Sequence, residues 1–465
     1  MKAMVKCALA AGLAAACGAC VSDVPQLERD RAKVERFAAM SADERAAHAR
    51  AVQLQVCDLE LMPPVVNANP DPKVYGFDKI DFAMNAGMAR TRGGRLVALW
   101  HAGADGPRSY VAGTWSDDDG RTWQGTKFVI GNRDPIFYVG ASAPIYRTIV
   151  ISNVWAAPDG TLRIYAFQAM NQFDDRGVLF EIVCRDPDAA EPVWEPARFL
   201  CYGSAHNKPI VLKDGTWVIP ADFEYCAHLA GNAFPDLDPL RGCAALASTD
   251  QGRTWVRRGA VPPTKEDTHA CEHSIVERPD GRLHMFLRTF GGLKESESAD
   301  GGRTWSAPKL PDAIRQPVAR FAYIRLASGK LLVVKNGFTP MEIVTRTDKA
   351  GKPVDPWWTA RSRLTAFVSD DEGKTWKGGL RIDPRARVAY PDAFQAPDGS
   401  IYVTYDHDRN TKRDEILFAK FTEADVLAGR LVTAGSSLRN VIFSEGGRPS
   451  SVSGKQEERK DNEDK

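Results

Sequence analysis

The chain has 465 residues, of which 43% are hydrophobic and 26% are charged, and its 61 Lys and Arg residues nearly balance its 60 Asp and Glu residues. A formal net charge of +1 argues against a nucleic-acid-binding protein, because such proteins attract the phosphate backbone with an excess of basic side chains. The composition is typical of a globular protein, and past the N-terminus no run of about 18 apolar residues predicts a membrane-spanning helix.

Residues 1–20 have the layout of a secretory signal peptide. Lys2 and Lys6 precede an apolar, alanine-rich run, and small residues follow it. We therefore expect export, either to the periplasm, to the outside of the cell, or to the outer membrane through a lipid anchor. Cleavage is expected near Cys17 or Cys20, and lipid attachment at either cysteine stays open.

The segment 21–60 predicts one or two amphipathic helices ahead of the main domain. Its apolar residues recur at the spacing of one helical face, and they are Leu27, Val34, Phe37 and Met40. Ser41, followed three residues later by Glu44, has the pattern of a capping box at the start of a second helix. We expect this segment to pack against the main domain or to space it from the N-terminus.

Six cysteines follow the signal peptide: Cys57, Cys184, Cys201, Cys226, Cys243 and Cys271. An even number in an exported protein is compatible with up to three disulfides, and buried thiols are the alternative. None of these cysteines has CxxC spacing, so the sequence predicts no zinc site.

Four segments share the pattern Ser-x-Asp-x-Gly-x-Thr-Trp, at residues 116–123, 248–255, 298–305 and 369–376. This pattern is typical of a tight turn between two strands. The Asp side chain accepts hydrogen bonds from turn amides, Gly adopts a positive φ, and Trp packs back on the sheet. Four copies in one chain indicate a repeat architecture.

A second series consists of six short turns, each followed by an apolar or alternating strand. Their glycines lie about 60 residues apart on average and are Gly94, Gly160, Gly215, Gly281, Gly329 and Gly399. That spacing suits a four-stranded sheet with its loops. We therefore predict an all-β fold, a six-bladed β-propeller over residues 65–446 with a short N-terminal helical segment. The polar tail at 450–465 is expected to be disordered.

These repeats resemble the Asp boxes of the sialidase (neuraminidase) superfamily, and the likeness spans most of the chain after the signal peptide. Longer stretches, among them NKPIVLKDGTW at 207–217 and YPDAFQ at 390–395, are similar to bacterial sialidase-like proteins with BNR repeats. Asp boxes are structural and also occur in propellers without enzymatic activity. The function must therefore be argued from other residues.

The resemblance implies a retaining glycosidase that needs no metal and no cofactor. The substrate of such an enzyme carries a carboxylate at the anomeric carbon, so a neutral Tyr serves as nucleophile and a Glu takes its proton. By position, Tyr390 matches the nucleophile, Glu272 the base that activates it, and Asp105 the general acid and base. Arg288 and Arg361 match two of the arginines that bind the substrate carboxylate.

One feature of the superfamily is missing. Its first carboxylate-binding Arg lies in an Arg-Ile-Pro segment on the opening strand, where this chain has Ala83 and Met84. Arg320 and Lys208 are candidates for the missing cation, although neither lies in a matching motif. For the later clamp position, Arg363 is the rival of Arg361, because alternation along a strand puts both on one face. The absence weakens sialic acid itself as substrate more than another acidic sugar.

Two other functions stay open. His206, His269, His273 and His407 lie near loops of the expected active-site face, and a His with a Tyr can perform β-elimination on a uronic acid, as in propeller polysaccharide lyases. The other alternative is a propeller that binds carbohydrate without catalysis. We expect the partner to be an acidic oligosaccharide or glycoconjugate and not a nucleic acid, and the main prediction is hydrolysis at its non-reducing end.

Overall fold

The computed structural model describes residues 25–41, 43–44, 59–131, 146–170, 176–224, 234–263, 270–343, 346–347, 353–354, 361–409, 411 and 413–447. The predicted signal peptide, the polar tail at 450–465, Cys57, Cys226 and His269 lie outside these residues. Export and lipid attachment therefore remain predictions.

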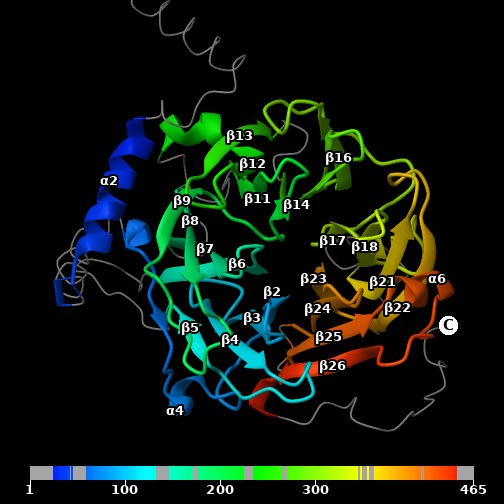
Figure 1. The fold of residues 1–465 in the computed structure, drawn as a ribbon, viewed down its shortest axis with the longest axis horizontal. Coiled ribbons are helices and arrows are strands. Elements are labelled where there is room, and N and C mark those ends of the chain that lie inside the picture. The colour runs from blue at the N-terminus through cyan, green and yellow to red at the C-terminus, as the bar shows by residue number, and fades with distance from the viewer. Residues whose placement is uncertain are drawn as a thin grey trace, which may run out of the picture.

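Six β-sheets stand around a central axis in the described part of the chain, which confirms the predicted all-β, six-bladed propeller (Figure 1). The first sheet contains β1 (Val66–Asn67), β2 (Met84–Arg90), β3 (Leu96–Ala102), β4 (Tyr110–Ser116) and β5 (Phe128–Ile130). The second contains β6 (Arg147–Ala156), β7 (Leu162–Met170), β8 (Val178–Cys184) and β9 (Arg198–Tyr202). The third contains β10 (Ile210–Val211), β11 (Trp217–Phe223), β12 (Gly242–Ser248) and β13 (Val256–Val261).

The remaining three sheets follow the same order along the chain. The fourth contains β14 (Ala270–Glu277), β15 (Leu283–Thr289) and β16 (Gly292–Ser298). The fifth contains β17 (Ala322–Arg325), β18 (Leu331–Asn336), β21 (Ser362–Ser369) and β22 (Lys377–Ala386). The sixth contains β23 (Val388–Gln395), β24 (Ile401–His407), β25 (Glu415–Phe421) and β26 (Ser437–Ser444). A separate hairpin between β18 and β21 contains β19 (Arg346–Thr347) and β20 (Pro353–Val354).

Helical elements are short and lie outside the sheets. They are α2 (Pro25–Ala39), α4 (Pro72–Tyr75), α6 (Glu423–Ala428) and the 3-10 turns η2 (Leu59–Leu61), η3 (Pro235–Leu240) and η4 (Glu445–Gly447). Within the described ranges, no helix is long and apolar enough to cross a membrane.

The repeated turns form as the sequence predicts. All six glycines of the second series have a positive φ, between 83° and 99°, and each donates its amide to the carbonyl three residues earlier. In the first Asp box, Asp118 accepts hydrogen bonds from the Ser116 hydroxyl at 2.7 Å and from the Thr122 amide and hydroxyl at 2.9 and 2.6 Å. The boxes that begin at Ser248, Ser298 and Ser369 repeat this network. The hydrogen bonds are local, which is why the motif is legible in sequence.

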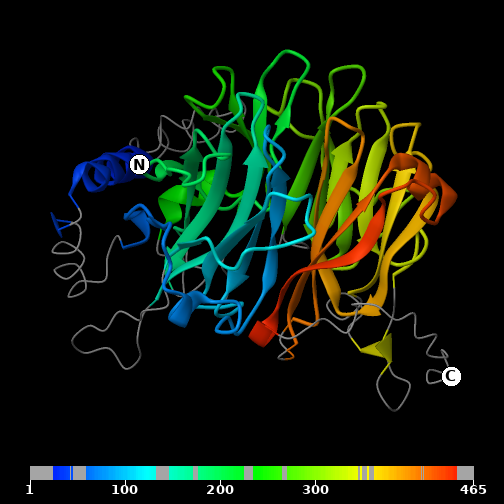
Figure 2. The ribbon, with the colours of Figure 1, turned by 60° about the horizontal axis from the view of Figure 1, so that its bottom comes forward.

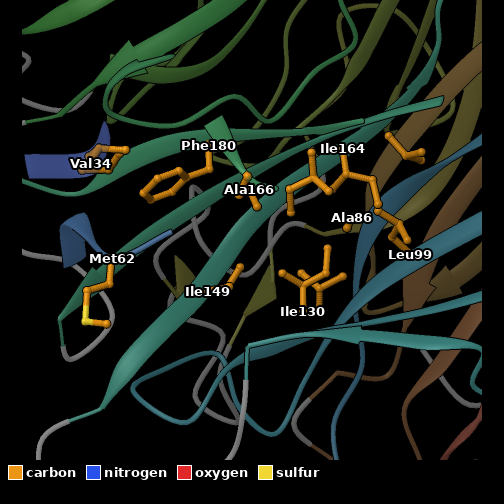
Figure 3. Close-up of a cluster of buried hydrophobic side chains, with 14 of the residues drawn as sticks. Val34, Met62, Ala86, Leu99, Ile130, Ile149, Ile164, Ala166 and Phe180 are labelled. Atoms are coloured by element: carbon orange, nitrogen blue, oxygen red, sulfur yellow. The ribbon is translucent and has the colours of Figure 1, made fainter. Parts of the chain in front are cut away.

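The core is divided into apolar clusters between neighbouring blades. Separate clusters lie between the first and second, second and third, third and fourth, fourth and fifth, fifth and sixth, and sixth and first blades. Figure 3 shows the first of them, where Ala86 and Leu99 of one blade meet Ile164 and Phe180 of the next. Burying a large side chain of this kind stabilises the fold by roughly 1.5–3 kcal/mol.

The N-terminal helix α2 lies outside the ring beside the second blade (Figures 1 and 2). Leu27, Val34 and Phe37 are buried in the cluster between the first two blades, which confirms the predicted amphipathic face. Ser41 and Glu44 form the predicted capping box: the Ser41 amide donates to Glu44 at 2.8 Å, and the Glu44 amide donates to the Ser41 hydroxyl at 3.3 Å.

The cysteines of the strands do not form the full set of disulfides. Cys184 and Cys201 are buried free thiols, so three disulfides among the six cysteines are excluded. Both lie in apolar clusters between blades, where a small side chain fills space without a partner. Burial raises the pKa of Cys184 to about 11 and that of Cys201 to about 12, so neither is a reactive thiolate at neutral pH.

Side chains close the ring between the last and first blades, because each of the six sheets takes its strands from one stretch of chain. Asp406 accepts the Asn85 amide at 3.1 Å, Asp392 accepts the Met88 amide at 3.0 Å, and Asp414 accepts the Ala83 amide at 3.0 Å. These carboxylates of the sixth blade satisfy amides of β2 and the segment before it. The opening strand is thereby fixed next to β23 and β24.

Candidate active site

Glu272 and Tyr390 lie on the inner strands β14 and β23, each at a β-bulge. The pairing of β14 with β15 slips between Cys271 and Ser274, and that of β23 with β24 slips between Ala389 and Asp392. At these bulges Glu272 has a φ of 46° and Tyr390 a φ of 54°, a left-handed conformation that non-glycine residues rarely adopt. The bulges aim both side chains at the axis of the propeller, and such strain is concentrated at functional sites.

The two side chains meet Arg288, which comes from β15. The Tyr390 hydroxyl donates to Glu272 Oε1 at 2.7 Å, and Arg288 Nη1 donates to the Tyr390 oxygen at 3.2 Å. Arg288 also forms an ion pair with Glu272 Oε1. All three are buried, with 1%, 6% and 9% of Glu272, Arg288 and Tyr390 exposed. The sequence-predicted nucleophile, base and clamp residue thus form one contiguous group.

At neutral pH, Glu272 carries a negative charge and Tyr390 keeps its hydroxyl proton. Burial alone would raise the pKa of Glu272, but the charge and hydrogen bond of Arg288 outweigh it and hold that pKa well below its usual range. Burial, together with the negative charge of Glu272, raises the pKa of Tyr390 to about 12. At neutral pH the site therefore contains a carboxylate positioned to receive the proton of a neutral phenol.

Two more arginines lie against the ring of Tyr390. The guanidinium carbon of Arg361, which directly precedes β21, is 5.5 Å from the ring centre, and that of Arg409, which follows β24, is 4.4 Å from it. Arg363, the rival candidate, instead pairs with Glu342 at 2.7 Å and stacks over Phe338. The structure therefore places Arg361, and not Arg363, beside the predicted nucleophile.

Asp105 lies at the rim of the site in the loop between β3 and β4. Its Oδ2 is 3.8 Å from Arg409 Nη1, and 40% of its side chain is exposed. A carboxylate that is exposed at the mouth of a buried site can meet both a leaving group and water. This placement agrees with what a general acid and base requires.

Arg320 and Lys208, the candidates for the missing cation, both bind Asp392. Arg320 Nη2 is 3.2 Å from Asp392 Oδ1, and its other donors go to Asn207 and to the carbonyl of Ala86. Lys208 Nζ is 2.7 Å from Asp392 Oδ2. The two cations neutralise a buried carboxylate that closes the ring, so the structure gives them a role in the fold. Neither of them is among the cations at the ring of Tyr390, which are Arg361 and Arg409.

Lys208 and Asp392 also line a cavity of about 1060 Å³. Its other lining residues include members of the second series of turns, which we call the inner turns, such as Gly160, Lys213 and Asp398. Because these turns lie at the opposite end of the blades from Glu272 and Tyr390, this cavity is distinct from the candidate active site. The ion pairs of Asp392 with Lys208 and Arg320 separate the cavity from the candidate active site.

The histidines proposed for a lyase differ in their surroundings. His206 Nδ1 lies 3.6 Å from Glu272 Oε1, and burial lowers the pKa of His206 to about 4, which keeps it neutral at pH 7. His273 Nε2 contacts the carbonyl of Ala244 in the third blade at 2.9 Å. His407 Nδ1 contacts Glu415 at 2.9 Å. Of these three imidazoles, that of His206 is the one next to the Glu272 carboxylate.

His206, Asp222 and Glu224 bring possible metal-binding atoms within 4.8 Å of one another. One imidazole and two carboxylates are a donor set that suits a divalent transition metal. Burial, together with the charge of Glu224, raises the pKa of Asp222 well above its usual value. The Ser204 hydroxyl donates to Asp222 Oδ2 at 3.0 Å. A proton on Asp222 would relieve the repulsion between the two carboxylates without a cation.

Arg409 is the residue that the motif analysis missed. It is 8% exposed, and its Nε lies 3.8 Å from the buried carboxylate of Asp406. The available signal was the sequence YDHDR at 405–409, directly after the strand that pairs with the strand of Tyr390. No repeat or motif marks Arg409 in this stretch, so the sequence analysis did not single it out.

A six-bladed propeller with a Tyr–Glu pair among arginines at its axis belongs to the sialidase-like class of propellers. The sequence matches the BNR repeat-like domain over residues 94–403, which is more than half of the chain. The chain therefore belongs to the BNR repeat-like domain family. This confirms the predicted resemblance to sialidase-like proteins with BNR repeats.

Similar proteins agree with this assignment. The chain is 28% identical over 180 residues to the anhydrosialidase of Macrobdella decora, a match that covers 37% of this chain and 22% of that protein, less than a quarter of its length. The solved intramolecular trans-sialidase of Ruminococcus gnavus superposes with a TM-score of 0.56 at 13% identity, covering 76% of this chain and 97% of that one. The NanB sialidase of Streptococcus pneumoniae superposes with a TM-score of 0.52 at 14% identity, covering 75% and 69%. At such identities the structures establish a shared fold.

Proposed function

We propose that the protein is an exo-acting glycoside hydrolase of the sialidase superfamily, which removes a terminal acidic sugar with retention of configuration. The observation that carries the proposal is the 2.7 Å hydrogen bond from the buried Tyr390 hydroxyl to the Glu272 carboxylate, with Arg288 on the same oxygen. A neutral nucleophile paired with a base suits an anomeric carbon that bears a carboxylate, because an anionic nucleophile would be repelled.

The reaction has two steps. In the first, the Tyr390 oxygen attacks the anomeric carbon and gives its proton to Glu272, while the glycosidic bond breaks and the leaving oxygen takes a proton from Asp105. In the second, a water molecule gives a proton to Asp105 and attacks the anomeric carbon of the tyrosyl-glycosyl intermediate. The bond to Tyr390 breaks, and its oxygen recovers the proton from Glu272. Arg288 and Arg361 hold the carboxylate of the sugar in both steps.

Tyr390→Phe tests the nucleophile. We expect turnover to fall by about 10³-fold or more, because the attacking oxygen is removed while the fold is retained. The matched control is Tyr323→Phe, which removes the hydroxyl of another buried Tyr of an inner strand, 3.1 Å from His284. A second measurement uses mass spectrometry to detect a glycosyl group on the peptide that contains Tyr390 after reaction with a fluorinated, slowly hydrolysed sugar. A fully active Tyr390→Phe variant would refute the assignment.

The substrate is identified by a panel of sialosides, glycosides of other ulosonic acids and uronic-acid oligosaccharides. Hydrolysis of a terminal acidic sugar, with the retained anomer formed first by NMR, supports the proposal. An unsaturated uronate product, detected by its ultraviolet absorbance, would instead indicate a lyase that uses His206 or Tyr390. Tight binding without any product would indicate a carbohydrate-binding propeller.

A second candidate differs only in the acceptor of the glycosyl group. Two of the similar proteins are named anhydrosialidase and intramolecular trans-sialidase, which favours attack by a hydroxyl of the sugar itself in place of water. The same NMR experiment distinguishes the two outcomes, because an intramolecular product is a bicyclic anhydro sugar with no free anomeric hydroxyl. Tyr390, Glu272 and Asp105 keep their proposed roles in either case.

A further inference from the structure

Among the described residues, an apolar cluster around Met84 lies where the first two blades meet the site. Met84, which stands where the superfamily has its first carboxylate-binding Arg, packs with Phe82 of the same segment and with Ile151 and Phe167 of the second blade. Tyr390 belongs to the same cluster. An anion gains nothing from such a wall, because its charge would lose hydration without meeting a donor. The Met84 side chain and its apolar neighbours therefore offer no donor to the carboxylate of a substrate.

Arg409 supplies a cation on the side of the sixth blade. Its guanidinium lies over the face of the Tyr390 ring at 4.4 Å, and 8% of its side chain is exposed. Asp105 Oδ2 lies 3.8 Å from Nη1 of Arg409, and Asp406 Oδ1 lies 3.8 Å from its Nε. Both distances allow an ion pair but are too long for a hydrogen bond. Its Nη1 is buried and has no hydrogen-bond partner among the described residues. A buried donor of this kind is costly unless a ligand or water satisfies it.

The charges around Arg409 also favour an anion. Burial would lower the pKa of Arg409, but the charge of Asp406 outweighs burial, and the pKa of Arg409 is raised, so the side chain is a permanent cation. Arg288 lies at the oxygen of Tyr390, and Arg361 lies against its ring. These three guanidinium groups come from the fourth, fifth and sixth blades. Planar guanidinium groups match the two oxygens of a carboxylate better than ammonium groups do.

We propose that Arg409 replaces the opening-strand Arg of the sialidase pattern as the third cation that binds the substrate carboxylate. This inference rests on the proposed function and specifies its substrate class. The carboxylate lies between the fourth, fifth and sixth blades, and the uncharged part of the sugar faces Phe82 and Met84. The enzyme then selects acidic sugars whose side opposite the carboxylate is weakly polar.

The test compares acid and ester forms of the same probe. Binding of 2,3-didehydro-2-deoxy-N-acetylneuraminic acid and of D-glucuronate, each with its methyl ester, is measured by calorimetry for the wild type, Arg409→Ala, Arg409→Lys and Arg363→Ala. Arg363 is the matched control, because it pairs with Glu342 and stacks over Phe338, apart from Tyr390. Thermal unfolding is recorded for every variant to confirm that it is folded.

We expect the wild type to prefer at least one acid over its ester by about 10- to 100-fold. Arg409→Ala should lose most of that preference with the ester affinity unchanged, Arg409→Lys should retain part of it, and Arg363→Ala should retain all of it. Failure of the wild type to prefer either acid overturns the inference, as does an equal loss of acid and ester affinity in Arg409→Ala. The latter result would mean that Arg409 only neutralises Asp406.

Different results contradict the role of Arg409 and the proposed hydrolase activity. If no glycoside is cleaved but the preference for acid depends on Arg409, the anion site stands and the hydrolase proposal falls. If a glycoside is cleaved and the preference for acid survives in Arg409→Ala, the hydrolase proposal stands and the role of Arg409 falls.

Discussion

Glu272→Gln tests the electrostatic account of the site most directly. The substitution keeps the shape of the side chain and replaces its carboxylate with a neutral amide. Glu272 is 1% exposed and is the partner of Arg288, which is 6% exposed. His206, at 3.6 Å from Glu272, is neutral at pH 7, because burial lowers its pKa to about 4. The variant therefore removes the negative charge that pairs with the buried guanidinium of Arg288.

The size of the effect follows from this geometry. Breaking a buried ion pair by removing one charge typically costs about 3–5 kcal/mol. The amide oxygen of Gln still accepts a hydrogen bond, so we expect a loss at the lower end, about 3 kcal/mol in the free energy of unfolding. Without a base to take the proton of Tyr390, kcat should fall by about 10²- to 10⁴-fold.

The assay is urea unfolding of four proteins: the wild type, Glu272→Gln, Arg288→Met and the double variant. If the charges interact as proposed, the double variant loses less stability than the sum of the single variants, with a coupling of about 2–3 kcal/mol. Glu277→Gln, at the other end of β14, is the matched control, because its carboxylate accepts the Lys213 amide at 2.8 Å in an exposed position. Additive losses, or a Glu272→Gln variant with wild-type stability and activity, would refute the reasoning.

Further predictions concern the Asp box of the fifth blade and the closure of the ring. Asp371→Ala removes acceptors for the Ser369 hydroxyl and for the Thr375 amide and hydroxyl, so urea unfolding should show a loss of about 2–3 kcal/mol with kcat unchanged. Its neighbour Asp370 forms an exposed ion pair with Lys377, and Asp370→Ala should leave the urea midpoint nearly unchanged. Burial alone would raise the pKa of Asp371, but the bonds from Thr375 lower it to about 2, so its contribution is complete above about pH 4 and is lost as the pH falls through 2. The difference in stability between wild type and Asp371→Ala should therefore shrink over that range, and a constant difference would contradict it. Burial raises the pKa of Asp414 to about 6, so the wild type should lose stability as the pH rises from about 4 to 6, and Asp414→Asn should abolish that decline in a series of melting curves.

The fold was predictable because its repeats are held by local contacts. The hydrogen bonds of each Asp box join residues two to four positions apart, and each inner turn closes over three positions. Such contacts leave a pattern of fixed spacing in the sequence. The pair of Glu272 and Arg288 was predictable for the same reason, because β14 and β15 form one hairpin in which Cys271 lies opposite Arg288.

The remainder of the site depends on contacts that no local pattern reveals. Arg409 reaches the ring of Tyr390 from beyond the end of β24, and its position depends on Asp406, whose other oxygen binds the amide of Asn85, 321 residues away in sequence. Arg320 is a cation at the centre of the propeller, as the sequence suggested, but its position next to Asp392 depends on how the sixth blade meets the first. The closure of the ring therefore places Arg409 and Arg320 next to their carboxylate partners.

The same closure explains how the strained residues of the site are held. A left-handed conformation costs a non-glycine residue about 1–2 kcal/mol, so Glu272 and Tyr390 persist there only if other contacts fix the backbone. Asn207 of the third blade donates its amide to the carbonyl of Glu272 at 2.7 Å, and Asn85 of the first blade donates to the carbonyl of Tyr390 at 2.7 Å.

Each of these hydrogen bonds crosses from one blade to the next, and a net contribution of about 1 kcal/mol apiece offsets much of the strain. Equivalent bonds join Asn153 of the second blade to the carbonyl of His206 and Asn336 of the fifth blade to the carbonyl of Val388. The residues proposed to perform the chemistry are therefore placed where neighbouring blades are locked together. A change in the packing between blades would move the Tyr390 hydroxyl relative to the Glu272 carboxylate, so the precision of the site is a property of the closed ring and not of a single blade.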